Sequence, residues 1–195
     1  MKSFLYIVLC ILAIAILSGC DTKPEEPEVE GIPAENAPLM PEMEYTTIDN
    51  AFIAGTYLGK ETSAITISKD NVFIESEKMI GYDYVSLCDI KGNLSVYLNN
   101  GQITSYVFGS TPFKEKDKFR ESFNNANKKI AELLGMEEIQ PAFMGQMNNC
   151  DEMDSVFGGN GILKAEYIQN GRTISVSSCG VSEAATVIIE CSKAK

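Results

Sequence analysis

Hydrophobic and polar residues alternate over short stretches through most of the chain beyond residue 45, which is the pattern of half-buried β-strands. Two Asn-Gly pairs, at residues 100–101 and 170–171, are typical of type I′ hairpin turns, and such turns fix which residues face each other across the paired strands. The opposed pairs predicted in this way are Leu98–Ile103, Val96–Ser105 and Leu94–Val107 in the first hairpin, and Tyr167–Ile174 and Ala165–Val176 in the second.

Further strands are predicted on both sides of these hairpins. A turn at Lys91-Gly92 would place Val85 and Leu87 opposite Leu98 and Val96, so that one apolar face continues across three strands. The remaining candidate strands are residues 52–58, 64–68, 72–76 and 185–191, and residues 137–160 are expected to be rich in loops.

The period of the apolar residues changes from 2 to 3.6 after Gly109, which predicts one long amphipathic helix over about residues 112–134. Thr111 suits the N-cap, Pro112 the first helical position and Gly135 the C-terminal stop. The apolar face of this helix is predicted to consist of Phe119, Phe123, Ala126, Ile130, Leu133 and Leu134. Strands before and after one helix indicate an α+β domain, with a largely antiparallel sheet of about 7–8 strands and the helix packed on one face.

The first residues of the chain carry a different pattern, an unbroken apolar run from Phe4 to Leu17 behind a single basic residue, Lys2. The run is about 14 residues long, shorter than the roughly 20 needed to span a bilayer, and therefore indicates a signal peptide. The sequence Leu17-Ser18-Gly19-Cys20 that follows resembles the lipobox of bacterial lipoproteins. The resemblance implies that residues 1–19 are removed and that the Cys20 thiol is lipidated, which anchors the protein to a membrane when two or three acyl chains are attached.

The residues after Cys20 predict the cellular location of the protein and a tether between the anchor and the domain. In enteric bacteria an aspartate at the position of Asp21 implies retention in the inner membrane, so we expect the periplasmic side of that membrane, with the outer membrane as the alternative. Residues 20–44 hold five of the seven prolines and eight acidic residues against one lysine, a composition that does not fold and that proline stiffens. Residues 45–195 are then expected to form a single globular domain.

Charge excludes one class of partner. Without residues 1–19 the chain has 15 basic and 27 acidic residues, and most of the acidic excess lies in the tether, which leaves a net charge of −5 on residues 45–195. Because nucleic-acid binding requires a basic surface, nucleic acid is not an expected partner. No cofactor is expected either.

Four cysteines remain for the domain: Cys88, Cys150, Cys179 and Cys191. Outside the cytoplasm an even set of this kind predicts two disulfides, with three possible connectivities. A bridge between Cys179 and Cys191 is disfavoured, because a hairpin would hold them about 20 Å apart and bridged Cα atoms lie within about 7 Å. Of the two connectivities that remain, we favour Cys150 with Cys179 and Cys88 with Cys191. Zinc is the poorer interpretation, because the chain has no histidine.

Soft ligands recur at every third residue in Met144, Met147, Cys150 and Met153. Thioether and thiolate groups suit Cu(I), and the periplasm is a compartment in which copper is handled, so these residues form a candidate copper site. The alternative, which we favour, is that the methionines are packing residues and that Cys150 belongs to a disulfide.

Catalytic motifs do not stand out in this sequence. The absence of histidine removes the usual base for a serine or cysteine nucleophile, and no pair of carboxylates is singled out for glycoside hydrolysis. We therefore expect a non-enzymatic module that binds another protein of the cell envelope, either as an inhibitor or immunity protein or as an envelope assembly accessory. A lipoprotein that binds Cu(I) or a small ligand is the second hypothesis, and a carboxylate-based hydrolase is the last.

Overall fold

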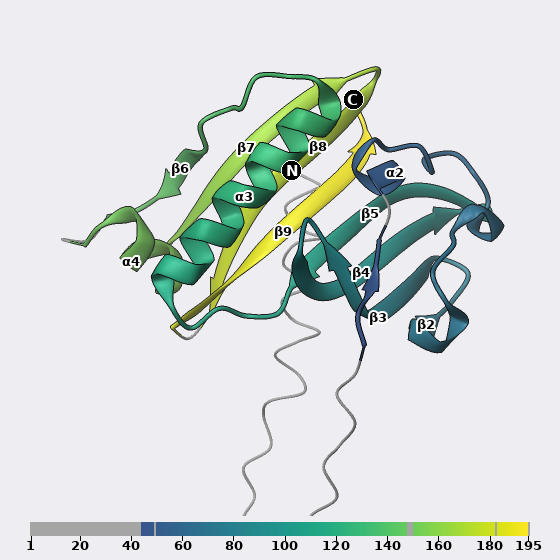
Figure 1. The fold of residues 1–195 in the computed structure, drawn as a ribbon, viewed down its shortest axis with the longest axis horizontal. Helices are drawn as coiled ribbons and strands as arrows, with labels where there is room; N and C mark the ends of the chain where they lie inside the picture. Colours follow the sequence, from purple (N-terminus) through teal and green to yellow (C-terminus); the bar gives the residue numbers. More distant parts are fainter. Residues whose placement is uncertain (1–43, 49, 148–149, 182, 195) are drawn as a thin grey trace, which may run out of the picture. The chain divides into compact units, whose positions relative to one another are not determined.

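Nine strands form one sheet in the computed structural model, which describes residues 44–48, 50–147, 150–181 and 183–194 (Figure 1). The strands are β1 (Thr46–Thr47), β2 (Val72–Glu75), β3 (Met79–Leu87), β4 (Ile90–Asn99), β5 (Gln102–Ser110), β6 (Ala142–Gly145), β7 (Gly161–Gln169), β8 (Arg172–Val181) and β9 (Ala184–Lys193). Their order is β1-β3-β4-β5-β9-β8-β7-β6, with β2 also paired to β3. All pairs are antiparallel except β1 with β3.

Helices cover one side of this sheet. They are α2 (Asn50–Ile53), α3 (Lys116–Leu134) and α4 (Glu152–Phe157), with single 3-10 turns at Thr62–Ala64 and Lys69–Asn71. Figure 1 shows α3 lying across β7, β8 and β9. The α+β class, the mostly antiparallel sheet and the one long helix are therefore confirmed, whereas the sheet has nine strands rather than 7–8.

The two Asn-Gly hairpins form where the sequence places them. Both residues of each pair have positive φ, 52° and 75° in the first turn and 51° and 70° in the second, as a type I′ turn requires. The second hairpin has the predicted register, Tyr167 opposite Ile174 and Ala165 opposite Val176.

The register of the first hairpin is only partly as predicted. Leu98 faces Ile103, but the register then shifts by one residue, so that Val96 pairs with Tyr106 and Leu94 with Phe108. The predicted partners Ser105 and Val107 are therefore wrong. This bulge turns the aromatic rings of Tyr106 and Phe108 into the core, where they are 3% and 0% exposed.

The turn between β3 and β4 lies at Cys88-Asp89 and not at Lys91-Gly92. Both turn residues have positive φ, 54° and 63°, and Leu87 consequently pairs with Ile90 and Val85 with Gly92. Gly92 is needed inside β4, because a Cβ atom there would lie 2.1 Å from the carbonyl oxygen of Gly109 on β5. The glycine thus permits a close approach of two strands rather than a turn.

Helix α3 begins four residues later than predicted. The backbone of Phe113 exchanges two hydrogen bonds with Ala185 at the sheet, 2.8 and 3.0 Å long, which keeps this residue extended. Glu115 is the N-cap, and Thr111 and Pro112 precede the helix. Gly135 ends it in the left-handed conformation, as predicted, with φ 63°. The predicted apolar face is buried except for Leu133, which is 42% exposed.

The predicted strand over residues 52–58 is wrong, since α2 and the turns after it occupy this region. Residues 64–68 also form no strand, whereas residues 72–76 correspond to β2. The Tyr106 hydroxyl of β5 donates a hydrogen bond to the Phe52 carbonyl, and the Arg172 guanidinium of β8 donates one to the Ala54 carbonyl. Both donors bind carbonyl groups at the end of a short helix, and both come from distant parts of the sequence.

Residues 137–160 are more ordered than expected, because they contain β6 and α4. Asp151 is the N-cap of α4, where its carboxylate accepts a hydrogen bond of 2.8 Å from the backbone N–H of Asp154. The helix buries Met153, Val156 and Phe157 against the sheet. Its packing against β7 and β8 closes one end of the core.

A polar network ties α3 to the segment that follows it. Asn127 is fully buried, and its side-chain oxygen accepts a hydrogen bond of 2.7 Å from the hydroxyl of Tyr167 on β7. The Asn127 amide donates to the Ile139 carbonyl at 2.9 Å, and the N–H of Ile139 donates to the Tyr167 hydroxyl at 3.2 Å. Each of these groups is thus satisfied, which is the condition for burying them at low cost.

Candidate functional site

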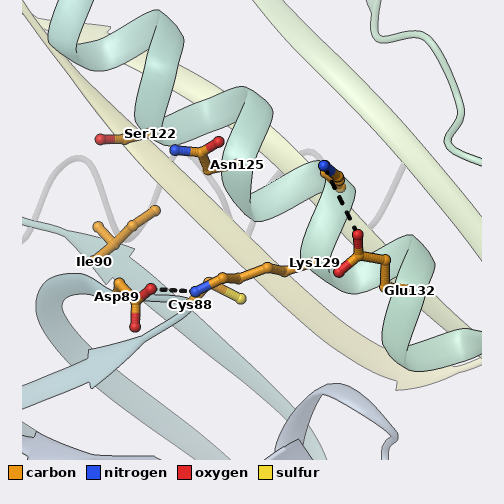
Figure 2. A pocket seen from close by; sticks show the side chains of 8 residues that line it. Cys88, Asp89, Ile90, Ser122, Asn125, Lys129 and Glu132 are labelled. Carbon is orange, nitrogen blue, oxygen red and sulfur yellow. Dashed lines mark hydrogen bonds and ion pairs between the residues drawn. The ribbon is translucent and has the colours of Figure 1, made fainter.

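A small cavity lies between α3 and the turn that joins β3 to β4 (Figure 2). Its volume is about 240 Å³. The turn contributes Cys88, Asp89 and Ile90, and one side of α3 contributes a polar stripe of Ser122, Asn125, Lys128, Lys129 and Glu132. A helix presents such a stripe because residues three and four apart lie on the same side.

Charges of both signs line this cavity and neutralise each other. Lys129 forms an ion pair with Asp89 (Figure 2), and the Nζ atom of Lys128 lies 4.0 Å from the Oε1 atom of Glu132. The Asp89 side chain is 87% exposed, so this pair contributes little to stability. Ligand pockets usually have volumes of about 300–1,000 Å³ and apolar walls. This cavity is smaller and polar, and it does not suit an apolar ligand.

Cys88 contributes a thiol to the cavity. Burial raises the pKa of its thiol to about 11; Lys129 opposes this rise and Asp89 adds to it. A thiol with that pKa is protonated at neutral pH, and the thiolate is the nucleophile. The cavity therefore lacks the features of a cysteine-based active site.

We expect the Cys88 thiol of the folded protein to react with iodoacetamide at pH 8 roughly a hundredfold more slowly than an ordinary thiol, because a pKa two units higher leaves about a hundredth of the thiolate. Quantitative mass spectrometry of the peptide that contains Cys88 measures this rate. Labelling in guanidinium chloride is the control and should be fast. Fast labelling in the folded state would contradict the prediction.

The raised pKa of Cys88 also predicts that the stability of the protein depends on pH. The folded state holds the Cys88 proton more tightly than the unfolded state does, so the free energy of unfolding should fall as pH rises from about 9 to about 11. Cys88→Ser should lose this part of the decline. An identical pH profile for this variant and the unaltered protein would show that Cys88 does not contribute.

All four cysteines of the domain are free thiols in the structure. The sulfur of Cys150 lies 3.2 Å from the Ser155 hydroxyl of α4, on the helix-covered side of the sheet. Cys179 points to the other side, because its neighbour Gly180 faces the backbone of Val156 in α4 and side chains alternate along a strand. The sheet separates the two thiols, and the predicted Cys150–Cys179 pair is not formed.

The predicted pair of Cys88 and Cys191 is not formed either. Cys191 on β9 lies opposite Tyr106 on β5 and Ile174 on β8. Cys88 lies in the turn after β3, and β3 is three strands away from β9 in the sheet. Cys179 faces Thr186, five residues before Cys191 on β9, which corresponds to about 17 Å. This separation agrees with the sequence argument against a bridge between Cys179 and Cys191.

The candidate copper ligands differ in burial and in the side of the sheet on which they lie. Met153 is 6% exposed and belongs to the core, whereas Met144 and Met147 are 46% and 58% exposed. Met144 faces Ile162 on β7, on the side of the sheet opposite to Cys150. Among the described residues, no three His, Cys, Asp or Glu side chains come together as a metal site.

The acidic residues beside Cys150 have structural partners. Asp151 caps α4, and Asp154 forms an ion pair with Lys116 at the start of α3. Hydrogen bonding to Lys116 lowers the pKa of Asp154. Asp154 therefore joins α4 to α3, whereas Asp151 stabilises the start of α4.

The side of the sheet opposite the helices carries the larger candidate surface. In the described part of the chain α2, α3 and α4 all contact the other side, and a Cβ atom added at Gly109 would meet no atom within 4 Å. We call the outward residues of β4, β5, β9, β8 and β7 the open face. They are Lys91, Asn93, Ser95, Tyr97, Ser105, Val107, Gly109, Ala184, Thr186, Ile188, Glu190, Ser192, Thr173, Ser175, Ser177, Cys179, Val181, Ile162, Lys164, Glu166 and Ile168.

Small and apolar residues dominate the open face. Its charged members are Lys91, Lys164, Glu166 and Glu190. Serine, threonine, alanine and glycine occupy much of the three central strands, β5, β9 and β8. Exposed hydrophobic residues surround them: Ile162, Ile168 and Val181 on the face itself, Met144 beside Ile162, and Phe73 and Ile74 over Gly81 on β3.

The sequence predicts this surface only in part. The alternation Thr173-x-Ser175-x-Ser177 indicates a strand with one polar side, but not whether another element covers that side. The same limit applies to the cavity, because Ser122 and Asn125 become its lining only when the β3–β4 turn packs beside them. Both features depend on contacts between distant segments.

Comparison with known proteins does not add a family. No family model, curated protein or solved structure matches the chain. None of the described helices is long and apolar enough to cross a membrane. The predicted cleavage site, the lipidation site Cys20 and the sorting residue Asp21 lie outside the described residues.

Proposed function

We propose that the protein is a lipid-anchored, non-enzymatic module that binds another protein of the cell envelope through the open face. The observation that carries this proposal is a wide sheet surface with few charges, small central side chains and exposed hydrophobic residues around them. The cores of protein interfaces are depleted of charged residues in the same way. Exposed hydrophobic residues that gather on one surface are typical of interaction sites.

The chemistry of the domain supports binding rather than catalysis. The chain has no histidine, and its partly buried thiol Cys88 is protonated at neutral pH. The cavity beside this thiol, with a volume of about 240 Å³, is smaller than a usual ligand pocket. A protein partner for the open face accounts for more of the exposed surface than a ligand in that cavity does.

The anchor and tether would set how far from the membrane the open face can bind its partner. Lipidation of Cys20 would attach the chain to the inner membrane, and the 24 residues that follow would extend up to about 75 Å if fully stretched. The net negative charge of this segment would hold it away from anionic headgroups. Within this class the protein would act as an inhibitor or immunity protein, or as an accessory of envelope assembly.

Site-specific photo-crosslinking in living bacteria tests the proposal. A photoreactive amino acid at Ser177, in the middle of β8 on the open face, should give one defined adduct with another envelope protein. The same amino acid at Asn124, on the exposed side of α3, is the matched control and should give none. Adding Ile188→Arg to the Ser177 probe should abolish the adduct, because it places a charge in the centre of the face.

Two results would contradict the proposal. Adducts at Asn124 but not at Ser177 would assign binding to another surface. Binding of Cu(I) by the reduced protein, lost in the double variant Met144→Leu and Met147→Leu, would favour the second hypothesis. Fractionation of the Cys20→Ser variant tests the anchor separately, since the unaltered protein should stay with the inner membrane and the variant should not.

A further inference from the structure

We propose that the outer edge of β6 binds an extended, uncharged segment of the partner protein, which pairs with β6 as an additional antiparallel strand. β6 is the last strand at its end of the sheet, and no described strand pairs with its outer side. This inference rests on the proposed function and names the part of the partner that binds. Several classes of protein recognise an extended segment by adding it to the edge of a sheet in this way.

The backbone of β6 presents hydrogen-bonding groups on its outer side. The N–H of Gln146 donates to the carbonyl of Asn160 at 3.1 Å, in line with the pairing of β6 to β7. Backbone groups of an antiparallel strand point alternately to its two sides, so those of Met144 also point to β7, whereas those of Phe143 and Gly145 point away from the sheet. The N–H and C=O groups of these two residues have no strand partner in the described part of the chain. An extended segment would pair with all four groups.

Gly145 leaves its part of the edge uncovered. A Cβ atom there would lie 2.5 Å from the carbonyl oxygen of Asn160 and 2.5 Å from the Cα atom of Gly161, so the close approach of β7 requires glycine at this position. Because glycine has no side chain, residue 145 does not shield its own outward N–H and C=O groups. A second backbone can therefore come within hydrogen-bonding distance of them.

The two ends of the sheet differ in how their outer strands are protected from pairing. Bulges and charged side chains are common means of preventing another strand from joining an edge. At the far end, β2 has a register shift after Val72 and carries Glu75. β6 has no register shift, and the sequence from Ile139 to Cys150 contains no charged residue. The β6 edge is therefore the one suited to a further strand.

The side chains around the edge indicate the chemistry of the bound segment. Met144 is 46% exposed and lies opposite Ile162, which is 37% exposed. Met147, two residues beyond β6, is 58% exposed. A charged residue opposite Met144 would lose its hydration without gaining an opposite charge. We therefore expect an apolar segment, rich in the β-branched and aromatic residues that suit paired strands.

The open face supplies the rest of the contact area. Four residues at about 3.4 Å each span only about 14 Å, so the β6 edge is a small contact by itself. Ile162 belongs to the open face and lies opposite Met144, so the edge and the face are continuous. One partner can thus cover the open face and add a strand beside it.

Photo-crosslinking in living bacteria, followed by mass spectrometry, locates the segment. The photoreactive amino acid is placed at Ala142, which is exposed on β6. We expect one adduct, in which the crosslinked residue lies in an uncharged, apolar segment of another envelope protein. Adding Met144→Lys should abolish this adduct, because lysine prevents pairing at strand edges. The matched control is Leu133→Lys, at a side chain of α3 that is 42% exposed, and it should leave the adduct unchanged. Circular dichroism checks that each variant is folded.

A cysteine scan across the located segment tests the strand pairing itself. Met144 would lie in a non-hydrogen-bonded pair, where Cα atoms are about 4.5 Å apart, a distance that a disulfide bridges. Met144→Cys should form a disulfide with one residue of the segment and with neither of its sequence neighbours, whose side chains point to the other side. Ala142→Cys should select the residue two positions later in the partner, because the strands are antiparallel. Leu133→Cys is the control and should form no disulfide with the segment.

The outcomes separate this inference from the proposed function. An adduct at Ser177 without one at Ala142 overturns the strand pairing but still supports the proposed function. Disulfides at a spacing of three or four residues overturn the inference, because the bound segment is then a helix. An adduct of Ala142 with a second copy of this chain overturns it too, since the occupant is then not another protein. The predicted disulfides without an adduct at Ser177 support the inference and contradict binding through the open face.

Discussion

Replacement of Phe119 by alanine should lower the free energy of unfolding by about 3–5 kcal/mol, the usual cost of removing a large aromatic side chain from a packed core. Phe119 is fully buried, and its ring lies 6.1 Å from Phe113, 5.8 Å from Phe123 and 5.6 Å from Phe157, measured between centroids. It therefore joins α3 to α4 and to the segment that leaves β5. The cavity left by alanine would separate these three parts.

Urea denaturation followed by far-UV circular dichroism measures this effect, and thermal unfolding should show a midpoint lower by roughly 10 °C for a domain of this size. Phe73→Ala is the matched control, because the same substitution is made at a side chain that is 54% exposed. The control should cost less than about 1 kcal/mol. Equal losses in the two variants would mean that Phe119 does not hold the elements together.

Gly180→Ala should destabilise the protein by about 3 kcal/mol, because it crowds a site where two backbones meet. A Cβ atom at Gly180 would lie 1.6 Å from the carbonyl oxygen of Val156 and 3.2 Å from the Cα atom of Phe157. These are backbone atoms of α4, so no side-chain rotation relieves the overlap. The helix would have to move away from β8, and Val156 and Phe157 would lose their packing.

Gly109→Ala is the matched control for Gly180→Ala. Gly109 also lies in a strand of the same sheet, but a Cβ atom there meets no atom within 4 Å. Its stability should change by less than about 1 kcal/mol, and a small gain is expected because glycine weakens a strand. Denaturation curves of the two variants compare them directly. If both tolerate alanine equally, α4 does not pack on β8 as the structure has it.

The hairpins show which turns the local sequence can predict and which it cannot. Asn100-Gly101 and Asn170-Gly171 predict their turns because their backbone preference is intrinsic to the two residues. The same reasoning fails at Lys91-Gly92, where the glycine serves a close strand contact and the turn falls on Cys88-Asp89. Local preference cannot tell a turn glycine from a packing glycine, because the neighbouring strand is distant in sequence.

Helix α3 likewise has one end that local sequence predicts and one that it does not. Its apolar period and its stop at Gly135 follow from the sequence, since both depend on residues within a few turns of each other. Its start does not, because the hydrogen bonds of Phe113 to Ala185 on β9 outweigh the N-terminal signals of Thr111 and Pro112. The short helix α2 is a comparable case, since Tyr106 and Arg172 bind its last carbonyls.

By itself, the sequence determined the α+β class, the long helix, two of the hairpins and the expectation of a lipid anchor at Cys20. Each of these depends on a pattern of adjacent residues. Only the tertiary structure decided where the four thiols lie and which side of the sheet the helices leave uncovered. The physical reason is that burial and exposure are properties of packed pairs of elements, and a strand with two usable sides acquires its inner side only when a helix packs on it.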